Sequence, residues 1–264
     1  MNRTVAIVPA RLASTRLPGK ALIEISGKPM VCWVAERARL ACNVDRVIVA
    51  TDSQQIVDAV RSRGFEAVLT AGHHTSGTDR VAEVAAQIPD VEIIVNVQGD
   101  EPLISPETIE RAVNVMAAEI SKQAGAGIVT TWEPIESIDD LLNPDLVKVV
   151  LDGNENAIYF SRSPIPYPRD AVKRHGSPDV ALRNEPELLK LFRKHTGLYV
   201  YRRDVLLEFT KWPQSQLEQT EALEQLRALE HGVKIKVVEA CAPSTGVDTV
   251  EDLERVRELV GAML

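Results

Sequence analysis

Short apolar runs alternate with amphipathic stretches along the chain as far as about Gly125. The runs are rich in β-branched residues and have the length of strands, and they are TVAIV, RVIVAT, EAVL and EIIVNVQ. The stretches between and after them carry apolar residues at helical spacing, and they are PMVCWVAERARLA, SQQIVDAVRSR, TDRVAEVAAQI and SPETIERAV. This alternation predicts an α/β protein whose doubly wound sheet is largely parallel.

The pattern changes after Gly125. The runs LVKVVLD and NAIYFSR flank DGNE and predict an added antiparallel hairpin. Residues 161–195 are rich in Pro, Arg and Lys and lack apolar periodicity, so we expect a long loop there with one short helix near 186–193. The remaining expected elements are the strands HTGLYVYR and VKIKVVEA, one helix over LEQTEALEQLRALEHG ended by Gly232, and a closing helix over VEDLERVRELV.

Composition and charge exclude several classes of protein. The chain has 264 residues and a formal net charge of -8, which argues against a surface that follows nucleic-acid phosphates. No apolar run approaches the ~20 residues that a membrane-spanning helix needs, so we expect no membrane insertion. The three cysteines form no CxxC pair, which favours a reducing compartment, and we expect a cytoplasmic protein.

The loop after the first strand, within AIVPARLASTRLPGKAL, carries three cations, Arg11, Arg16 and Lys20. In open α/β sheets the loops at the carboxyl ends of the strands form the ligand crevice. Small residues such as Ser14 let backbone amides approach phosphate oxygens, and the cations supply charge, so the loop suits a triphosphate. It matches neither a Walker loop nor GxGxxG, and the alternative is a solvated basic loop.

Two acidic positions are candidates for a metal site. Asp100 ends the strand EIIVNVQ at the same sheet edge and is a candidate Mg²⁺ ligand, although a turn or helix-capping role is equally consistent with its spacing. Asp248 precedes the last helix, where Glu251 and Asp252 favour an N-cap for Asp248 or Thr249. Spacing alone does not bring Asp248 to Asp100. The pair His73–His74 is interpreted as solvent-facing or hydrogen-bonded, because no further ligand stands at metal spacing.

Taken together, the chain resembles the 3-deoxy-manno-octulosonate (Kdo) cytidylyltransferase family over essentially its whole length. The segments that carry the resemblance are PARLASTRLPGK, VIVATD, HTSGTDR, VNVQGDEP, VKVVLD, YFSRSPIPYPRD, HTGLYVYR, LEQLR and TGVDTVEDLERV. The resemblance implies a Rossmann-like nucleotide-diphospho-sugar transferase fold, with a mostly parallel mixed sheet and a smaller antiparallel lobe, in a homodimer. It implies a single catalytic domain over 1–264, made of a nucleotide-binding half (about 1–125), a sugar-binding and dimerisation lobe (about 126–232) and a C-terminal strand and helix (233–264) that return to the core.

The implied reaction joins CTP and Kdo to give CMP-Kdo and pyrophosphate, which activates Kdo for lipopolysaccharide synthesis. In it the anomeric hydroxyl of Kdo attacks the α-phosphorus of CTP, with Mg²⁺ as cofactor. The implied catalytic residues are Arg11, Lys20, Asp100 and Asp248, and the last two are also the implied metal ligands. The implied nucleotide-binding residues are Pro9, Ala10, Arg11, Ser14, Arg16, Lys20, Ser76, Gly77, Arg80, Gln98 and Gly99. The implied sugar-binding residues are Gln98, Arg162, His195, Gly197, Tyr199, Glu224 and Gln225.

Two positions depart from the family pattern: Ser244 stands where Gly is expected, and Thr196 where an aliphatic residue is commoner. The alternatives are a cytidylyltransferase for 8-amino-Kdo or a sialic acid, and a nucleotidyltransferase that uses another base. A catalytically silent nucleotide-sugar sensor is a third alternative, and the presence of both Asp100 and Asp248 argues against it.

Overall fold

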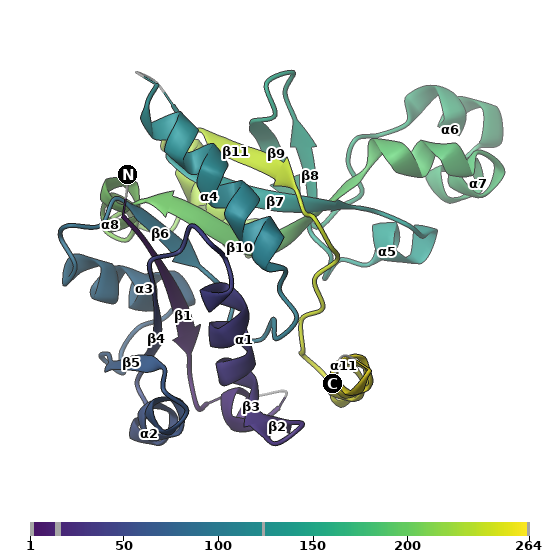
Figure 1. Cartoon of the computed structure of the whole chain (residues 1–264). Coiled ribbons are helices and arrows are strands. Elements are labelled where there is room, and N and C mark those ends of the chain that lie inside the picture. The colour runs from purple at the N-terminus through teal and green to yellow at the C-terminus, as the bar shows by residue number, and fades with distance from the viewer. Residues whose placement is uncertain (1–2, 14–16, 123–124, 263–264) are drawn as a thin grey trace.

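The computed structural model describes residues 3–13, 17–122 and 125–262. Its main sheet follows the order β11–β7–β10–β6–β1–β4–β5. The strands β1 (Thr4–Ala10), β4 (Arg46–Thr51), β5 (Glu66–Leu69) and β6 (Ile93–Asn96) run parallel, which confirms the expected doubly wound core. On the other side of β6, β10 (Arg193–Arg202) runs antiparallel to both β6 and β7 (Ile128–Pro134), while β11 (Ile235–Glu239) is parallel to β7. The sheet is therefore mixed (Figure 1).

Alternate residues of β1 pack on opposite faces of the sheet, as the two-residue period of a strand requires. Ala6 and Val8 contribute to the apolar cluster that contains α1 (Met30–Arg39), α2 (Gln54–Ser62) and α4 (Pro106–Ile120). Val5 and Ile7 contribute to the cluster on the other face, whose helices are α3 (Gly77–Ala86), α8 (Arg203–Phe209) and α10 (Gln225–Glu230). Each of the helices predicted before residue 125 is present, and α4 begins at the expected Ser105–Pro106 signal, with Ser105 Oγ accepting the Thr108 N–H.

The smaller antiparallel part is a hairpin of β8 (Lys148–Leu151) and β9 (Ala157–Ser161), as predicted, and β8 also pairs with β10. A two-stranded sheet joins β2 (Glu24–Ile25) to β3 (Lys28–Pro29), and a 3₁₀ turn, η1, covers Lys20–Leu22. A short helix, α5 (Ile138–Leu142), follows β7.

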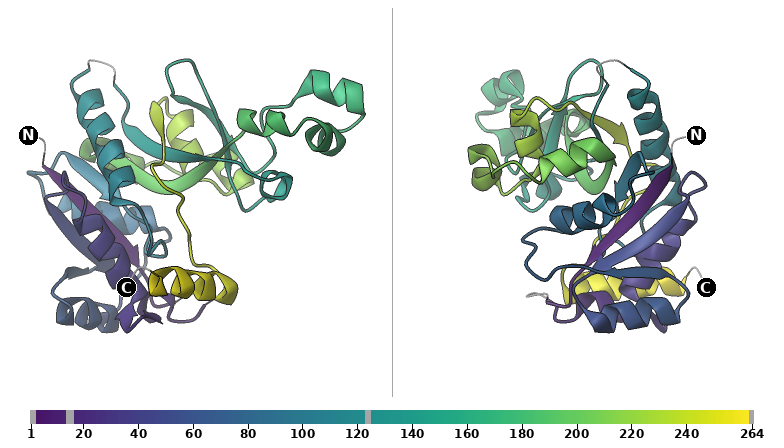
Figure 2. Two further views of the ribbon diagram at one scale, coloured as in Figure 1. Left: turned by 45° about the vertical axis from the view of Figure 1, so that its right-hand side comes forward. Right: turned by 90° about the vertical axis from the view of Figure 1, so that its left-hand side faces the viewer.

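Of the prediction for 161–195, the short helix near 186–193 is confirmed as a 3₁₀ helix, but the long loop before it is wrong. The segment contains α6 (Arg169–His175), α7 (Pro178–Asn184) and the 3₁₀ helix η2 (Pro186–Leu191), and it projects from the body of the molecule (Figure 2). Gly176, at φ +88°, ends α6, and Ser177 Oγ caps α7 by accepting the Val180 N–H. Each helix is too short to show a clear apolar period, and only a few of their side chains enter the local apolar cluster.

The prediction of one helix over LEQTEALEQLRALEHG is also wrong. The chain forms α9 (Gln216–Glu221) and α10, separated by Ala222 at φ +52°, which is in the left-handed region and breaks the helix. Gly232, at φ +75°, follows α10 as expected.

The last helix, α11 (Val250–Gly261), returns to the N-terminal half of the chain. Its Leu253, Val256 and Val260 pack with Ile25 and Met30 in a separate apolar cluster. An extended segment carries the chain from β11 to this helix (Figures 1 and 2). Over the part of the chain that the structure describes, no helix is long and apolar enough to cross a membrane.

Candidate active site

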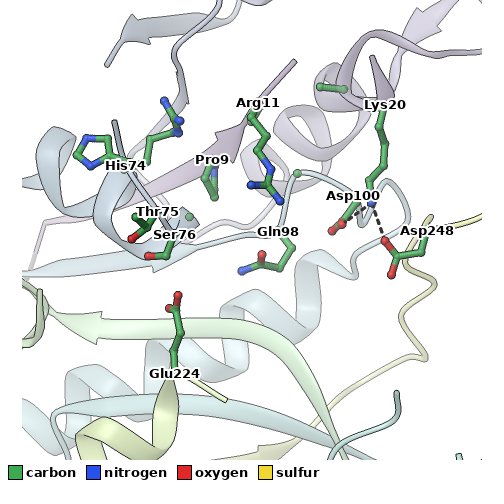
Figure 3. Close-up of a pocket in the computed structure, with 15 residues that line it drawn as sticks. Pro9, Arg11, Lys20, His74, Thr75, Ser76, Gln98, Asp100, Glu224 and Asp248 are labelled. Atoms are coloured by element: carbon green, nitrogen blue, oxygen red, sulfur yellow. Dashed lines mark hydrogen bonds and ion pairs between the residues drawn. The ribbon is translucent and has the colours of Figure 1, made fainter. Parts of the chain in front are cut away.

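A polar cavity of about 330 Å³ opens where β1 and β6 end. Four separate parts of the chain surround it: the segment after β1, the start of α3, the segment after β6, and the segment before α11, with one residue at the start of α10 (Figure 3). The side chains and backbone that line it are Pro9, Ala10, Arg11, Lys20, Ala21, His74, Thr75, Ser76, Gly77, Arg80, Gln98, Gly99, Asp100, Glu224 and Asp248. The parallel strands thus deliver their loops to one sheet edge, as the sequence led us to expect.

The two predicted metal ligands face one another across a lysine. Lys20 Nζ donates to Asp100 Oδ2 at 2.7 Å and to Asp248 Oδ1 at 2.9 Å (Figure 3). The Val247 N–H donates to the Asp100 carbonyl at 2.9 Å, which joins the two segments through their backbones. Among the described residues no group of three or more His, Cys, Asp or Glu side chains could hold a metal, and the carboxylates that meet at Lys20 are two in number.

Asp248 does not cap the last helix. Thr249 Oγ1 accepts the Asp252 N–H at 3.1 Å, and the Asp252 carboxylate accepts the Thr249 N–H in return at 2.9 Å, which forms a capping box. The capping role therefore falls to Thr249, and the Asp248 carboxylate turns to Lys20.

Gly99 brings two strand ends into close contact at the floor of the cavity. A Cβ atom at this position would lie 2.5 Å from the carbonyl oxygen of Pro9, closer than van der Waals contact allows. Gly99 is therefore required for the segment after β6 to approach the segment after β1. The neighbouring Gln98 side chain donates weakly to Asn96 Oδ1 at 3.3 Å.

The N-terminus of α3 forms another wall. Ser76 Oγ accepts the Asp79 N–H at 3.1 Å and so caps the helix, whose first residue, Gly77, lines the cavity. A helix N-terminus carries partial positive charge and favours anions. Arg80 also lines the cavity, but its guanidinium is buried and donates to Asp52 Oδ2 at 2.8 Å.

Glu224, at the start of α10, faces the α3 wall, where the Thr78 hydroxyl donates to its carboxylate at 2.6 Å. The following residue, Gln225, is buried. Both are predicted sugar-binding residues, and of the two only Glu224 lines the cavity.

Three other predicted sugar-binding residues lie on β10, beside the end of β6. Tyr199 is paired with Asn96 in the sheet, and the His195 ring lies between Phe160 and Tyr199, with centroid distances of 4.9 and 5.4 Å. Burial lowers the pKa of His195 to about 3, and it raises the pKa of Tyr199 well above its usual value, so both are neutral near pH 7. None of the three lines the cavity, but a Cβ atom on Gly197 would lie 3.1 Å from Cγ of Gln98.

The Arg162 side chain is held by hydrogen bonds outside the cavity. Its guanidinium donates to the Glu221 carbonyl at 2.7 Å and to the Pro144 carbonyl at 2.9 Å, and it does not line the cavity. Its predicted contact with the sugar stays a prediction. Two further predicted residues, Ser14 and Arg16, lie outside the described residues.

The sequence reasoning missed His74 and Thr75, both of which line the cavity. The His74 ring is hydrogen-bonded to Glu83, and Glu83 also accepts the Ala71 N–H at 3.0 Å. Of the two alternatives given for the His73–His74 pair, solvent-facing or hydrogen-bonded, the second holds for His74. The position of His74 two residues before the cap of α3 is the signal that would have assigned it to the cavity.

Glu101 is a buried carboxylate immediately behind the cavity. Burial, followed by the neighbouring charge of Asp100, raises the pKa of Glu101 to about 7. Its Oε2 accepts the Ser244 hydroxyl at 2.8 Å.

Known proteins resemble this chain over its full length. Residues 5–235 match the cytidylyltransferase family. The chain is 51% identical to the 3-deoxy-manno-octulosonate cytidylyltransferase of Pseudomonas fluorescens strain Pf-5, over 97% of each chain. It superimposes on a solved structure of CMP:2-keto-3-deoxy-manno-octonic acid synthetase complexed with CTP with a TM-score of 0.87 at 40% identity, covering 100% of both chains.

Two more distant solved structures share the fold alone. A cytidylyltransferase from Leptospira borgpetersenii is 15% identical with a TM-score of 0.61, covering 100% of this chain and 89% of its own. A 4-diphosphocytidyl-2C-methyl-D-erythritol synthase from Anaerococcus prevotii is 13% identical with a TM-score of 0.62, covering 98% of this chain and 99% of its own. The nucleotidyltransferase fold expected from the sequence is confirmed by the full-length match to the CTP-bound structure.

Proposed function

We propose that this chain, which belongs to the 3-deoxy-manno-octulosonate cytidylyltransferase family, converts CTP and Kdo to CMP-Kdo and pyrophosphate with Mg²⁺ as its cofactor. The chain is a nucleotidyltransferase, and the CTP complex of its structural relative supports CTP as the donor. The observation that carries the proposal is the convergence of two cations and two carboxylates from distant segments on one cavity: Arg11, Lys20, Asp100 and Asp248.

The reaction exchanges one phosphorus–oxygen bond for another. The anomeric hydroxyl oxygen of Kdo attacks the α-phosphorus of CTP, and the bond from the α-phosphorus to the oxygen that bridges to the β-phosphorus breaks. Pyrophosphate leaves with the bonding electron pair, and the hydroxyl proton passes to water. Such a transfer depends mainly on positioning and on stabilising the charge that develops on the phosphates.

Three features of the cavity suit a triphosphate. Arg11 is exposed and lines the cavity, and Lys20, which also lines it, supplies a second positive charge. The N-terminus of α3 at Gly77 adds the partial charge of its backbone N–H groups. Gly99, where a Cβ atom would collide with the Pro9 carbonyl, lets the backbone of the segment after β6 and that of β1 lie together at the cavity.

Asp100 and Asp248 fit a magnesium ion by the chemistry of their donor atoms. Mg²⁺ takes one or two carboxylates and completes its shell with substrate phosphates and water. The Lys20 ammonium within hydrogen-bond distance of both carboxylates supports a place for a cation between them. When bound, Mg²⁺ would neutralise phosphate charge and lower the pKa of the attacking hydroxyl. Lys20 would then donate to a phosphate instead of to the two carboxylates.

For Kdo we propose the side of the cavity between Gln98 and Glu224, with the β10 residues behind Gln98. Because His195 is uncharged, it cannot form an ion pair with the sugar carboxylate, and its Nε2 is already hydrogen-bonded to the Thr130 hydroxyl at 2.9 Å. Arg162 would reach the sugar only by giving up its contacts with two backbone carbonyls.

Homodimerisation, a cytoplasmic location and the supply of CMP-Kdo to lipopolysaccharide synthesis belong to the same proposal. We place the contact between the two copies on the lobe over 126–232, which exposes several large apolar side chains. These are Leu142, Ile158, Tyr167, Val180, Leu191 and Leu217.

The test is pyrophosphate release by the purified protein with Mg²⁺, comparing CTP with ATP, GTP and UTP, and Kdo with 8-amino-Kdo and N-acetylneuraminate. We expect release with CTP and Kdo, and loss of most turnover in a folded Asp100→Asn variant. Release with another sugar or base would overturn the substrate assignment but not the reaction class. No release with any pair, while CTP still binds, would favour the silent sensor.

A further inference from the structure

The extended segment from β11 to α11, residues 240–249, which we call the strap, carries Asp248 to the cavity. Hydrogen bonds join it to strand β7, to helix α4 and to the segment after β6. The Ala240 N–H donates to the Trp132 carbonyl and the Cys241 N–H to Thr108 Oγ1, each at 2.9 Å. At its other end the Val247 N–H donates to the Asp100 carbonyl. The position of Asp248 therefore depends on how the strap is held.

Ser244 anchors the strap at two points. Its N–H donates to Glu133 Oε1 and its hydroxyl donates to Glu101 Oε2, each at 2.8 Å. Both carboxylates are buried, with 5% of Glu133 and 9% of Glu101 exposed, and Lys194 pairs with Glu133 at 2.7 Å. Both carboxyl groups are withdrawn from water, so they depend on these protein partners for their hydrogen bonds.

The two links between the strap and the segment after β6 lie side by side. Asp100 and Glu101 are consecutive, and they bind Val247 and Ser244 respectively. One link is made by backbone alone, which any residue can form, whereas the other requires a hydroxyl at position 244. Together the two links fix the strap beside the carboxylates of Asp100 and Asp248, which meet at Lys20.

We infer that Ser244 is a positioning residue for the reaction: its hydroxyl, held by Glu101, keeps Asp248 opposite Asp100. The inference rests on the proposed function for its catalytic consequence, while the hydrogen bonds that it describes stand without it. Glycine, the residue that the family pattern leads us to expect at this position, could make the N–H contact but not the hydroxyl contact.

The test compares Ser244→Ala with Ser244→Thr, which keeps a hydroxyl, and with Ser177→Ala. Ser177 is a matched control because it caps α7, away from the cavity, and also loses one hydrogen bond when changed. We measure hydrogen–deuterium exchange of the Val247 amide without nucleotide or metal, and Mn²⁺ binding by calorimetry. For Ser244→Ala we expect faster exchange and about three- to tenfold weaker Mn²⁺ binding, which is the usual effect of losing one buried hydrogen bond. Ser244→Thr should restore both, and Ser177→Ala should change neither.

Normal exchange and normal Mn²⁺ binding in a folded Ser244→Ala variant would overturn the inference. Faster exchange with unchanged Mn²⁺ binding would overturn the positioning role, because the hydroxyl would then only stabilise the strap. These readouts need no turnover. If the wild-type protein released no pyrophosphate, the proposed function would fail while the exchange and Mn²⁺ measurements still decided the role of Ser244.

Discussion

Lys20 occupies the place between Asp100 and Asp248 where the proposed function puts a divalent ion, so replacing it should move metal affinity and turnover in opposite directions. The perturbation is Lys20→Met, which keeps most of the length of the side chain and removes the ammonium. The wild-type ammonium is within 2.9 Å of both carboxylates. It therefore competes with any other cation for the same two groups.

The magnitude follows from the exposure of the groups. Lys20 is 15% exposed, but Asp100 and Asp248 are 36% and 44% exposed, so solvent screens both ion pairs. Ion pairs of this kind contribute about 0.2–1 kcal/mol each. Removing a competitor worth about 1 kcal/mol in total should strengthen Mn²⁺ binding about fivefold in the absence of nucleotide. Turnover should fall about 10²–10³-fold, because the transferring phosphates lose a positioned cation.

The assay pairs calorimetric titration with Mn²⁺ and steady-state pyrophosphate release. Lys28→Met is the matched control, because Lys28 is a partly buried lysine paired with Glu36 and does not line the cavity. It should change neither quantity. Weaker or unchanged Mn²⁺ binding in Lys20→Met would refute the reasoning that the ammonium and the metal share one place, and undiminished turnover would refute the phosphate role of Lys20.

Three further predictions concern stability and the floor of the cavity. Because the folded pKa of His195, about 3, lies below the unfolded value of about 6.5, its contribution to stability is complete above pH 6.5 and is lost as pH falls towards 3. Urea unfolding should show that lowering the pH from 7 to 5 reduces the free energy of unfolding of the wild type by about 2 kcal/mol more than that of His195→Gln. An identical pH dependence in both proteins would contradict this. Gly99→Ala should destabilise the fold by about 1–3 kcal/mol and raise the KM for CTP, because its Cβ would meet the Pro9 carbonyl, and an unchanged KM and melting temperature would count against the close approach. Arg227→Leu should cost about 3–5 kcal/mol in chemical denaturation, since it leaves the buried Glu218 carboxylate unpaired; a cost below 1 kcal/mol would show that water reaches Glu218.

The nucleotide-binding half could be predicted from the sequence because its elements are long and periodic. Each strand that it contributes to the main sheet is an apolar run, and α4 has both a capping serine and a proline at its start, whereas the two-residue strands β2 and β3 were not predicted. The errors lie where elements are short. The helices α6 and α7 have seven residues each, and their order depends on a small apolar cluster and on single caps rather than on a repeating pattern. Likewise, the break at Ala222 lies inside a sequence of strong helix formers, where nothing local marks it.

Some residues of the candidate site could likewise be placed from the sequence, and others could not. The loop with Arg11 and Lys20 and the strand end at Asp100 could be assigned to one sheet edge, because parallel strands place their carboxyl ends together. Asp248 could not be assigned to this sheet edge from the sequence, since it lies 228 residues from Lys20 and its local pattern indicates a helix cap. Only the return of the strap across the molecule brings them into contact, and that return depends on tertiary hydrogen bonds that no sequence period encodes.

The proposed sugar side of the site could not be placed by the rule that parallel strands bring their carboxyl ends to one edge of the sheet, because strand β10 is antiparallel. Because β10 runs antiparallel to β6, only its last four residues pair with β6. Tyr199 meets the carboxyl end of β6 at Asn96, and His195 and Gly197 lie beyond that end. The pairing of β10 with β7 shifts between Thr196 and Tyr199, and at Gly197 a Cβ atom would stand 3.1 Å from Gln98 and 3.2 Å from Glu101. A residue with a side chain there would push against the two groups that support the cavity and the strap. Gly197 therefore couples the proposed sugar side of the site to the proposed metal side, and both are built on the strand end at residues 98–101.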